Sequence, residues 1–440
     1  MSYLKRNIKI FVSFGFVHVL LLSAHFFSLQ KEEYCPGKEN FEDETLGIFV
    51  QGGFVQKKTD QEVVIRAKDL AFIIQFKAKR DLELKVILAN IHPERTIVEV
   101  PEWKLDFSSQ SKNQGFFFLS LKANTTQTIS THFQYPEEKN SKILIGGDAE
   151  EGYFSLLKLR TKAISENPLF LLIVGDVVDK GTKFRYKMHQ DFFDTFPFPT
   201  FAVIGDGDLD KNSFHKELPL ESLFSLYHQF YGPIPFVIHI REQWNILGIN
   251  NLYMEPSDIE NLPSLSENLS ANKILVAHVP PFDPRENITE KKQLIHGAPF
   301  LDFLLQQHFI ASFYGEIHSF ISVPLENHQI IITGGLGKKL PDLSDYHFVN
   351  VFLEEDTLKF EPVFSPLNTL EEWLNKQAFW WWSWFYLCYW NSFWRQLQII
   401  LLLFCFIFLP ILYKLKLMQF FKRKSLPNLL PELSLTLPLV

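Results

Sequence analysis

Short apolar runs that alternate with polar residues and turns occupy the chain from about residue 47 to residue 136. Runs of this kind include residues 62–66, 82–88 and 115–121. A period of two is typical of strands with one buried face, and no long helical pattern interrupts these runs. The pattern predicts a small all-β sandwich domain over residues 47–136.

A different pattern begins after residue 140 and continues to about residue 366. Short apolar runs that suit buried strands alternate there with longer segments of helical period. This alternation predicts an α/β domain over residues 141–366, in which helices flank layered sheets. The expected strands are 143–145, 169–174, 201–204, 274–277 and 309–313, and the expected helices include 153–164, 218–231 and 300–308.

Two long apolar segments lie outside these predicted domains. Residues 10–29 are uncharged and would span about 30 Å as a helix, which is enough to cross a bilayer. Residues 397–413 form the second candidate transmembrane helix. Cationic residues precede the first segment and follow the second, so we expect residues 1–9 and 414–440 to be cytoplasmic. A cleaved signal peptide is the alternative for the first segment.

This topology predicts that both domains lie outside the cytoplasm, and the expected location is a bacterial inner membrane facing the periplasm. Tryptophan and tyrosine crowd into residues 379–394, which is typical of a helix at the level of the lipid headgroups. An aromatic extension of the second span is the alternative for this segment. A lipid bilayer is therefore a predicted partner of the chain.

Composition argues against two other classes of function. The 43 Lys and Arg against 50 Asp and Glu give a formal net charge of -7, so no basic excess indicates a nucleic-acid partner. The 3 cysteines cannot form a disulfide framework, and two of them lie in very apolar sequence, so the composition does not indicate redox chemistry.

Three of the predicted strands are followed by the same Gly-Asp pair. The aspartates of these pairs are Asp148, Asp176 and Asp206. The carboxyl ends of parallel strands meet at one edge of a sheet, where α/β folds gather ligands. Carboxylates placed so close repel one another unless cations neutralise them, so the pattern predicts a metal site. Further candidate ligands after two later apolar runs are His278, Glu316 and His318.

In order and spacing, these motifs resemble the calcineurin-like metallophosphoesterase family, and the preceding β-sandwich resembles the purple acid phosphatase arrangement. The family pattern is Asp-x-His, Gly-Asp-x-x-Asp, Gly-Asn-His, a histidine after an apolar strand, and Gly-His-x-His. The resemblance covers residues 143 to about 364. It implies a four-layer β-sandwich flanked by helices and the hydrolysis of a phosphomonoester or phosphodiester substrate.

The resemblance also implies a ligand set for two divalent or mixed-valence metal ions, with Mn, Fe, Mg and Zn as candidates. In this family such a pair lowers the pKa of a water molecule and clamps the phosphoryl oxygens. Asp176 would bridge the two ions, while Asp179 and Asp208 would orient the loops that carry the ligands. The ligands of the first ion would be Asp148, Glu150 and His318, and those of the second would be Asp206, His278 and Glu316.

Four positions depart from the family pattern. Glu150 and Glu316 replace histidines, Asp206 replaces an asparagine, and Gly207 replaces the histidine that faces the phosphate. The five ligand carboxylates outnumber by one the four positive charges of two divalent ions, and a site of net negative charge repels phosphate. His296 is the candidate catalytic residue that would compensate, because it lies where purple acid phosphatases place a substrate-facing histidine. A loop histidine without a catalytic role is the alternative.

These departures leave three hypotheses open. The first is a membrane-anchored metallophosphoesterase, for which restoring histidine at positions 207 and 316 should raise the activity. The second is a catalytically weak or inactive relative that uses the fold and a metal ion to bind a partner at the membrane. The third is a structural protein whose acidic cluster is a calcium or solvent-facing patch.

Overall fold

The computed structural model describes residues 33–137, 141–150, 152–210, 220–267, 269, 272–286, 288–340 and 343–377. The candidate membrane spans 10–29 and 397–413 and the aromatic segment 379–394 lie outside the described residues. Within the part of the chain that is described, none of the helices combines the length and the apolar character needed to cross a bilayer.

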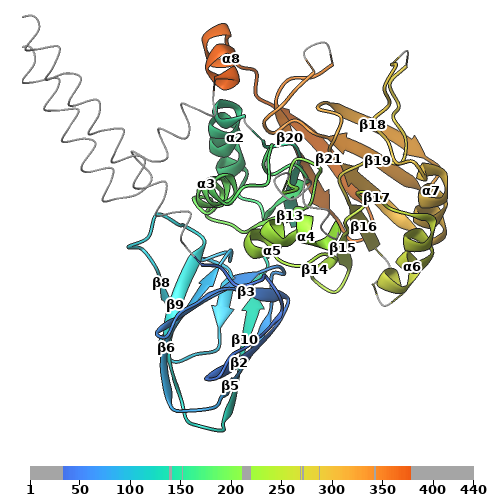
Figure 1. The fold of residues 1–440 in the computed structure, drawn as a ribbon. Helices are drawn as coiled ribbons and strands as arrows, with labels where there is room; N and C mark the ends of the chain where they lie inside the picture. The colour runs from blue at the N-terminus through green and yellow to red at the C-terminus, as the bar shows by residue number, and fades with distance from the viewer. Residues whose placement is uncertain are drawn as a thin grey trace, which may run out of the picture. The chain divides into compact units, whose positions relative to one another are not determined.

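Residues before position 137 form two five-stranded sheets, as the period of two predicts (Figure 1). One sheet has the order β1 (Asn40–Glu42), β2 (Leu46–Gln51), β5 (Ile73–Ala78), β10 (Thr126–Phe133) and β7 (Thr96–Val98). The other has the order β3 (Gly53–Lys58), β4 (Glu62–Ala67), β6 (Leu82–Ala89), β9 (Gln114–Leu121) and β8 (Lys104–Leu105). The pairing of β4 with β6 is parallel.

The two sheets share one apolar core. On β5, Ile74 and Phe76 are buried while their neighbours along the strand are exposed. Phe117 and Leu119 on β9 of the other sheet belong to the same core cluster. Because successive strand side chains point to opposite faces, this alternation gives each sheet one face to bury against the other.

The α/β part contains two further sheets. The first has the order β13 (Thr200–Val203), β12 (Leu171–Val174), β11 (Ser141–Gly146), β20 (His347–Leu353) and β21 (Leu358–Phe364). The second has the order β14 (Phe236–Ile240), β15 (Trp244–Gly248), β16 (Asn272–Val276), β17 (Phe309–Tyr314), β19 (His328–Thr333) and β18 (Phe320–Leu325). Strands β11 to β13 are parallel to one another, and so are β15, β16, β17 and β19.

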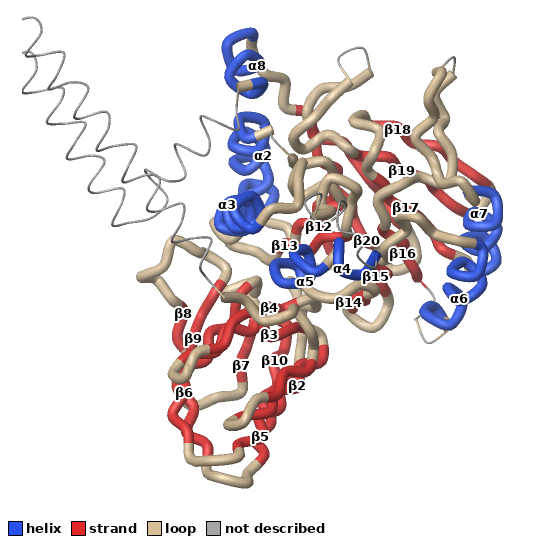
Figure 2. Tube along the Cα trace, viewed as in Figure 1, coloured by secondary structure: helices blue, strands red, loops and turns tan. Residues whose placement is uncertain are grey.

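Layers follow from which faces are buried. One core cluster joins residues of both sheets, such as Ile145 and Val174 with Val276 and Phe313. A second cluster joins the other face of the β16 sheet to helices α6 (Pro256–Ser266) and α7 (Gly297–Gln306). Figure 2 shows these two helices beside each other and apart from α2 and α3. The remaining helices are α2 (Tyr153–Glu166), α3 (Lys183–Phe193), α4 (Leu220–Leu223), α5 (Ser225–Tyr231) and α8 (Thr369–Lys376).

The strands and helices predicted for this part are present, with ends that shift by a few residues. The helix predicted over residues 218–231 is two helices, α4 and α5, on either side of Phe224. The sequence pattern missed α3, whose buried face includes Arg185 and Gln190, because polar side chains on that face hide its period. It also missed six strands, β14, β15, β18, β19, β20 and β21, of which β18 and β21 end their sheets and are only partly buried.

The sandwich and the α/β part meet through buried polar contacts. Arg66 on β4 donates two hydrogen bonds of 2.7 and 3.1 Å to the carboxylate of Asp194, the residue that ends α3. Elsewhere, Nδ1 of His239 on β14 lies 2.6 Å from Oδ2 of Asp69 in the sandwich. Arg66 and His239 are thus each paired with an aspartate across the contact between the two parts.

Candidate metal centre

The predicted ligands all follow the carboxyl ends of parallel strands. Asp148, Asp176 and Asp206 come after the neighbouring strands β11, β12 and β13 of one sheet. His278 and Glu316 come after the neighbouring strands β16 and β17 of the other sheet. Because the two sheets face each other across a common core, these turns meet at one edge of the double layer.

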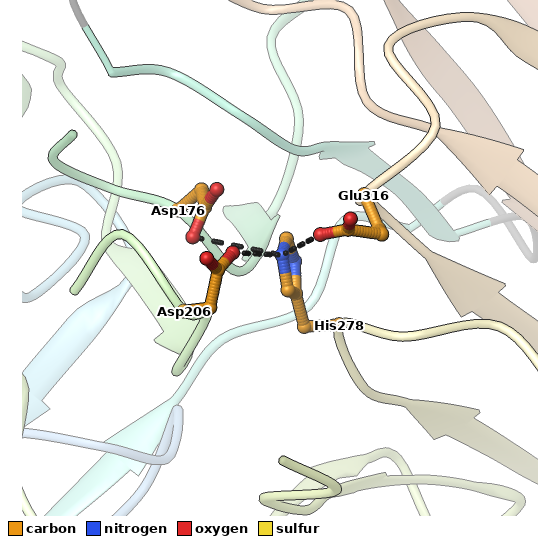
Figure 3. Close-up of side chains that lie close together, drawn as sticks. All are labelled: Asp176, Asp206, His278 and Glu316. Carbon is orange, nitrogen blue, oxygen red and sulfur yellow. Dashed lines mark ion pairs between the residues drawn. The ribbon is translucent and has the colours of Figure 1, made fainter. Parts of the chain in front are cut away.

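Four side chains from both sheets form one group of potential ligands: Asp176, Asp206, His278 and Glu316, with ligand atoms within 4.8 Å of one another. Figure 3 shows the three carboxylates around the ring of His278. Nε2 of His278 lies 3.5 Å from Oδ1 of Asp176 and 3.7 Å from Oδ1 of Asp206. The same nitrogen lies 3.1 Å from Oε2 of Glu316.

Asp148, Glu150 and His318 form the other group. Nε2 of His318 lies 3.3 Å from Oδ1 of Asp148. Asp176 belongs to the group of His278, and its carboxylate also interacts electrostatically with Asp148 and Glu150. The role of Asp176 as a bridge between two ions stays a prediction.

The donor atoms suit cations. The side chain of Asp148 is 0% exposed, and among the described residues none donates a hydrogen bond to either of its oxygens. Burying a carboxylate without hydrogen bonds costs free energy, and an ion bound at this position would remove that cost. Carboxylate oxygens with imidazole nitrogens fit Mn²⁺, Mg²⁺, Zn²⁺ or iron.

His278 has the tautomer that a metal ligand needs. Its Nδ1 lies 2.9 Å from the carbonyl oxygen of Val174, so Nδ1 carries a hydrogen and Nε2 faces the carboxylates. Burial opposes protonation of Nε2, but the attraction of Asp176 and its neighbours raises the pKa of His278 well above its ordinary value.

The backbone is strained at four of the predicted ligands. Asp148, Glu150, Asp176 and Glu316 have φ values of 56°, 37°, 50° and 61°. Residues other than glycine rarely adopt this left-handed conformation, which costs free energy that the surrounding fold must supply. Such strain is typical of functional sites, because it turns each carboxylate inward.

Asp208 and Asp179 hold in place the turns that carry the ligands. Asp208 accepts hydrogen bonds from the amides of Val177, Val178 and Gly205, at 3.2, 3.0 and 2.9 Å. It thereby ties the turn after β12 to the turn after β13. Asp179 forms an ion pair with Arg185 on α3, which fixes the other end of the first turn.

Two lysines that sequence reasoning missed contact the site. Lys338 contacts the carboxylate of Glu150. Nζ of Lys292 lies 3.0 Å from Oε1 of Glu316 and 2.9 Å from its carbonyl oxygen. Each glutamate that replaces a family histidine thus has a lysine beside it. The only signal in the sequence was that Lys338 directly follows the glycine-rich stretch 334–337.

The pKa values of the two glutamates are shifted in opposite directions. Burial would raise the pKa of Glu316, but its hydrogen bonds with His278 and Lys292 lower it below its ordinary value. Burial and the Asp176 carboxylate raise the pKa of Glu150 despite Lys338. The pKa of Lys338 is raised in turn, against the effect of burial, by attraction to Glu150. Their direct contact favours the ionised pair, since each charge stabilises the other.

Gly207 has no room for the histidine of the family pattern. Its amide donates a 2.7 Å hydrogen bond to Oδ1 of Asp176. A Cβ atom at this position would lie 2.6 Å from the carbonyl oxygen of Val178 and 3.0 Å from Oδ1 of Asp176. A histidine at 207 would have to displace the Val178 carbonyl or Asp176, and the expected rise in activity stays a prediction.

His296 belongs to neither ligand group. It lies at the N-terminus of α7, and its Nε2 is 4.0 Å from Oε2 of Glu255 at the start of α6. Its assignment as a substrate-facing residue stays a prediction. Sequence reasoning also missed Asn251, whose Oδ1 accepts hydrogen bonds from the amides of His278 and Val279 and so fixes the His278 turn.

Comparison with known proteins gives solved structures only, since no family model and no curated protein matches the chain. A purple acid phosphatase from yellow lupin seeds has 10% identity and a TM-score of 0.44, over 71% of this chain and 72% of that one. A dimetal phosphatase from Danio rerio has 12% identity and a TM-score of 0.38, over 50% and 95%. GAP50, the anchor in the inner membrane complex of Plasmodium, has 13% identity and a TM-score of 0.40, over 52% and 85%. The structural neighbours thus include metallophosphoesterases, but at these scores the residue roles rest on the side-chain geometry.

Proposed function

We propose that this protein is a metal-dependent phosphoesterase that hydrolyses a phosphomonoester or phosphodiester. The observation that supports the proposal most strongly is the pair of ligand groups, one of which contains the carboxylate of Asp148, which is buried and accepts no hydrogen bond from the described residues. Two divalent or mixed-valence ions held there would activate a water molecule and stabilise charge on the phosphoryl oxygens.

The chain's own residues have separate roles in this proposal. Asp148, Glu150 and His318 would hold one ion, Asp206, His278 and Glu316 would hold the other, and Asp176 would bridge them, which the membership of the two ligand groups supports. The Val174 carbonyl keeps Nε2 of His278 turned toward the carboxylates, and Asp208 keeps the turns in register. With Lys292 counted, two divalent ions would leave the site without net charge, which removes the repulsion of phosphate expected from the ligands alone.

The direct test is hydrolysis of an aryl phosphomonoester and an aryl phosphodiester by the full-length protein, titrated with Mn²⁺ and with iron. We expect metal-dependent hydrolysis that Asp176→Asn removes. Folded, metal-loaded protein that hydrolyses neither substrate would contradict the proposal.

The second candidate function is a metal-containing binding module with weak or no turnover. The backbone at Gly207 favours it, because no side chain there can donate a proton or hydrogen bond to a phosphate, a role typically worth 10²–10⁴-fold in rate. Under this hypothesis the protein binds metal ions but lacks hydrolysis, and Asp176→Asn leaves partner binding largely intact.

We also propose that the protein is anchored in a membrane by residues 10–29 and 397–413, with the α/β part outside the cytoplasm. The cationic flanks of both segments support this topology. Protease treatment of sealed, inside-out membrane vesicles tests it: we expect the α/β part to be protected, and its digestion would contradict the topology.

A further inference from the structure

The ammonium group of Lys338 lies against the first ligand group. It contacts the carboxylate of Glu150, and it also interacts electrostatically with Asp176 and Asp148. These three carboxylates are the ones that an ion in the first group would neutralise. A resident positive charge among them has the same electrostatic effect as part of an ion's charge.

The backbone fixes Lys338 at this place. The amide of Gly337 donates a 2.9 Å hydrogen bond to the carbonyl oxygen of Asp148, and the amide of Leu336 donates one of 2.9 Å to Gly147. A Cβ atom at Gly337 would overlap the carbonyl oxygen of Ala149, so only glycine allows this approach. The residue after Gly337 therefore starts next to the ligand turn.

Lys292 is placed differently, at the second group. It contacts Oε1 and the carbonyl oxygen of Glu316, while Oε2 of Glu316 faces Nε2 of His278. One carboxylate oxygen therefore stays directed at the centre of the group. Lys292 therefore orients Glu316, whereas the charge of Lys338 acts on the carboxylates that would bind the first ion.

We propose that Lys338 is a built-in competitor for the first ion, so that the second group binds a metal ion at lower concentration than the first. This inference rests on the proposed metal site, and it assigns the two positions unequal affinities. The Lys338 side chain is 43% exposed, so the ammonium can turn into solvent when an ion enters. Occupancy of the first position then depends on the free metal concentration.

The test is a titration of the metal-free, full-length protein with Mn²⁺, followed by the electron paramagnetic resonance signal of unbound Mn²⁺. We expect one tight and one weak site in the unaltered protein. Lys338→Met should tighten the weak site at least about tenfold, because a cation near the entering ion is removed, and should leave the tight site unchanged.

Lys339→Met is the matched control. Lys339 is the next residue and carries the same charge, but it pairs with Asp345 and Glu372 away from the ligands. It should leave both affinities as they are. Lys338→Gln provides a second neutral variant, and thermal unfolding with and without Mn²⁺ should show a larger metal-induced rise in Tm for both Lys338 variants than for Lys339→Met.

The outcomes separate this inference from the proposed function. Two equally tight sites in the unaltered protein, or a weak site that neither Lys338 variant tightens, would overturn the role of Lys338 and leave the metal centre standing. A folded protein that binds no Mn²⁺ at either position would overturn both.

Discussion

Buried charges occur in two regions of this molecule, and the chain treats them differently. Where the sandwich meets the α/β part, Arg66 is 2% exposed and its guanidinium is matched by both oxygens of Asp194. At the strand edge, Asp148 is as deeply buried, yet neither of its oxygens accepts a hydrogen bond from any residue that the structure describes. The first arrangement stabilises the fold, whereas the second leaves a cost that an external cation can remove.

The largest expected effect is on catalysis at the strand edge. Asp176→Asn removes the carboxylate proposed to bridge the two ions, so we expect kcat/KM for aryl phosphate hydrolysis to fall at least about a hundredfold, since the residues that only hold metal ligands in place are already worth about 10–100-fold. Asp81→Asn, an exposed change in the sandwich, is the control. Retained hydrolysis in Asp176→Asn would remove Asp176 from the centre of the site.

The next largest effect is on stability at the contact between the sandwich and the α/β part. Arg66→Met leaves the Asp194 carboxylate buried without its partner, which should lower the free energy of unfolding by about 3–5 kcal/mol. Urea denaturation measures this change. Lys122→Met, which breaks the exposed pair with Asp81, should change stability little. An Arg66 variant as stable as the unaltered protein would contradict the contrast between the two regions.

Asp148→Asn should have the opposite sign. In metal-free protein it removes a buried charge that has no hydrogen-bond partner, so we expect the free energy of unfolding to rise by about 1 kcal/mol. The same change should reduce the stabilisation that Mn²⁺ gives. Asp206→Asn, whose side chain is 55% exposed, should change the metal-free stability less. Destabilisation of metal-free Asp148→Asn would mean that the carboxylate is satisfied within the chain.

The smallest effect concerns pH at the contact between the sandwich and the α/β part. The hydrogen bond to Asp69 raises the pKa of His239, although burial opposes it. The folded protein thus binds this proton more tightly than the unfolded chain, so the stabilisation is fully present below about pH 6.5 and is lost as pH rises through the folded pKa. His239→Gln should therefore cost stability at pH 5.5 and little at pH 8.5. An equal cost at both pH values would exclude this ion pair as the cause.

How far the sequence predicts the structure depends on how local the signal is. Asp148, Asp176 and His278 were predictable because each directly follows an apolar strand, and parallel strands bring such turns to one edge. Lys338 and Glu150 are distant in the sequence, and no local pattern indicates where a long flexible side chain will point. The same holds for Arg66 and Asp194, which are 128 positions apart.

Gly207 shows a different limit. A motif comparison treats it as a histidine with the side chain removed, and that reading predicts that the histidine can be restored. In the structure, the Gly207 amide donates a hydrogen bond to Asp176, and the Val178 carbonyl lies close to where a side chain would begin. A sequence motif does not show whether a side chain fits at position 207, because the available space depends on where the neighbouring turn lies.

The left-handed backbone at Asp148, Glu150, Asp176 and Glu316 also bears on how this chain can change by mutation. Selection for abundance alone would favour glycine or asparagine at these four positions, since both relieve the strain. A deep mutational scan read out by expression level should therefore enrich for these two residues at all four positions. Acidic residues nevertheless occupy all four, so the sequence retains side chains that folding alone would not select.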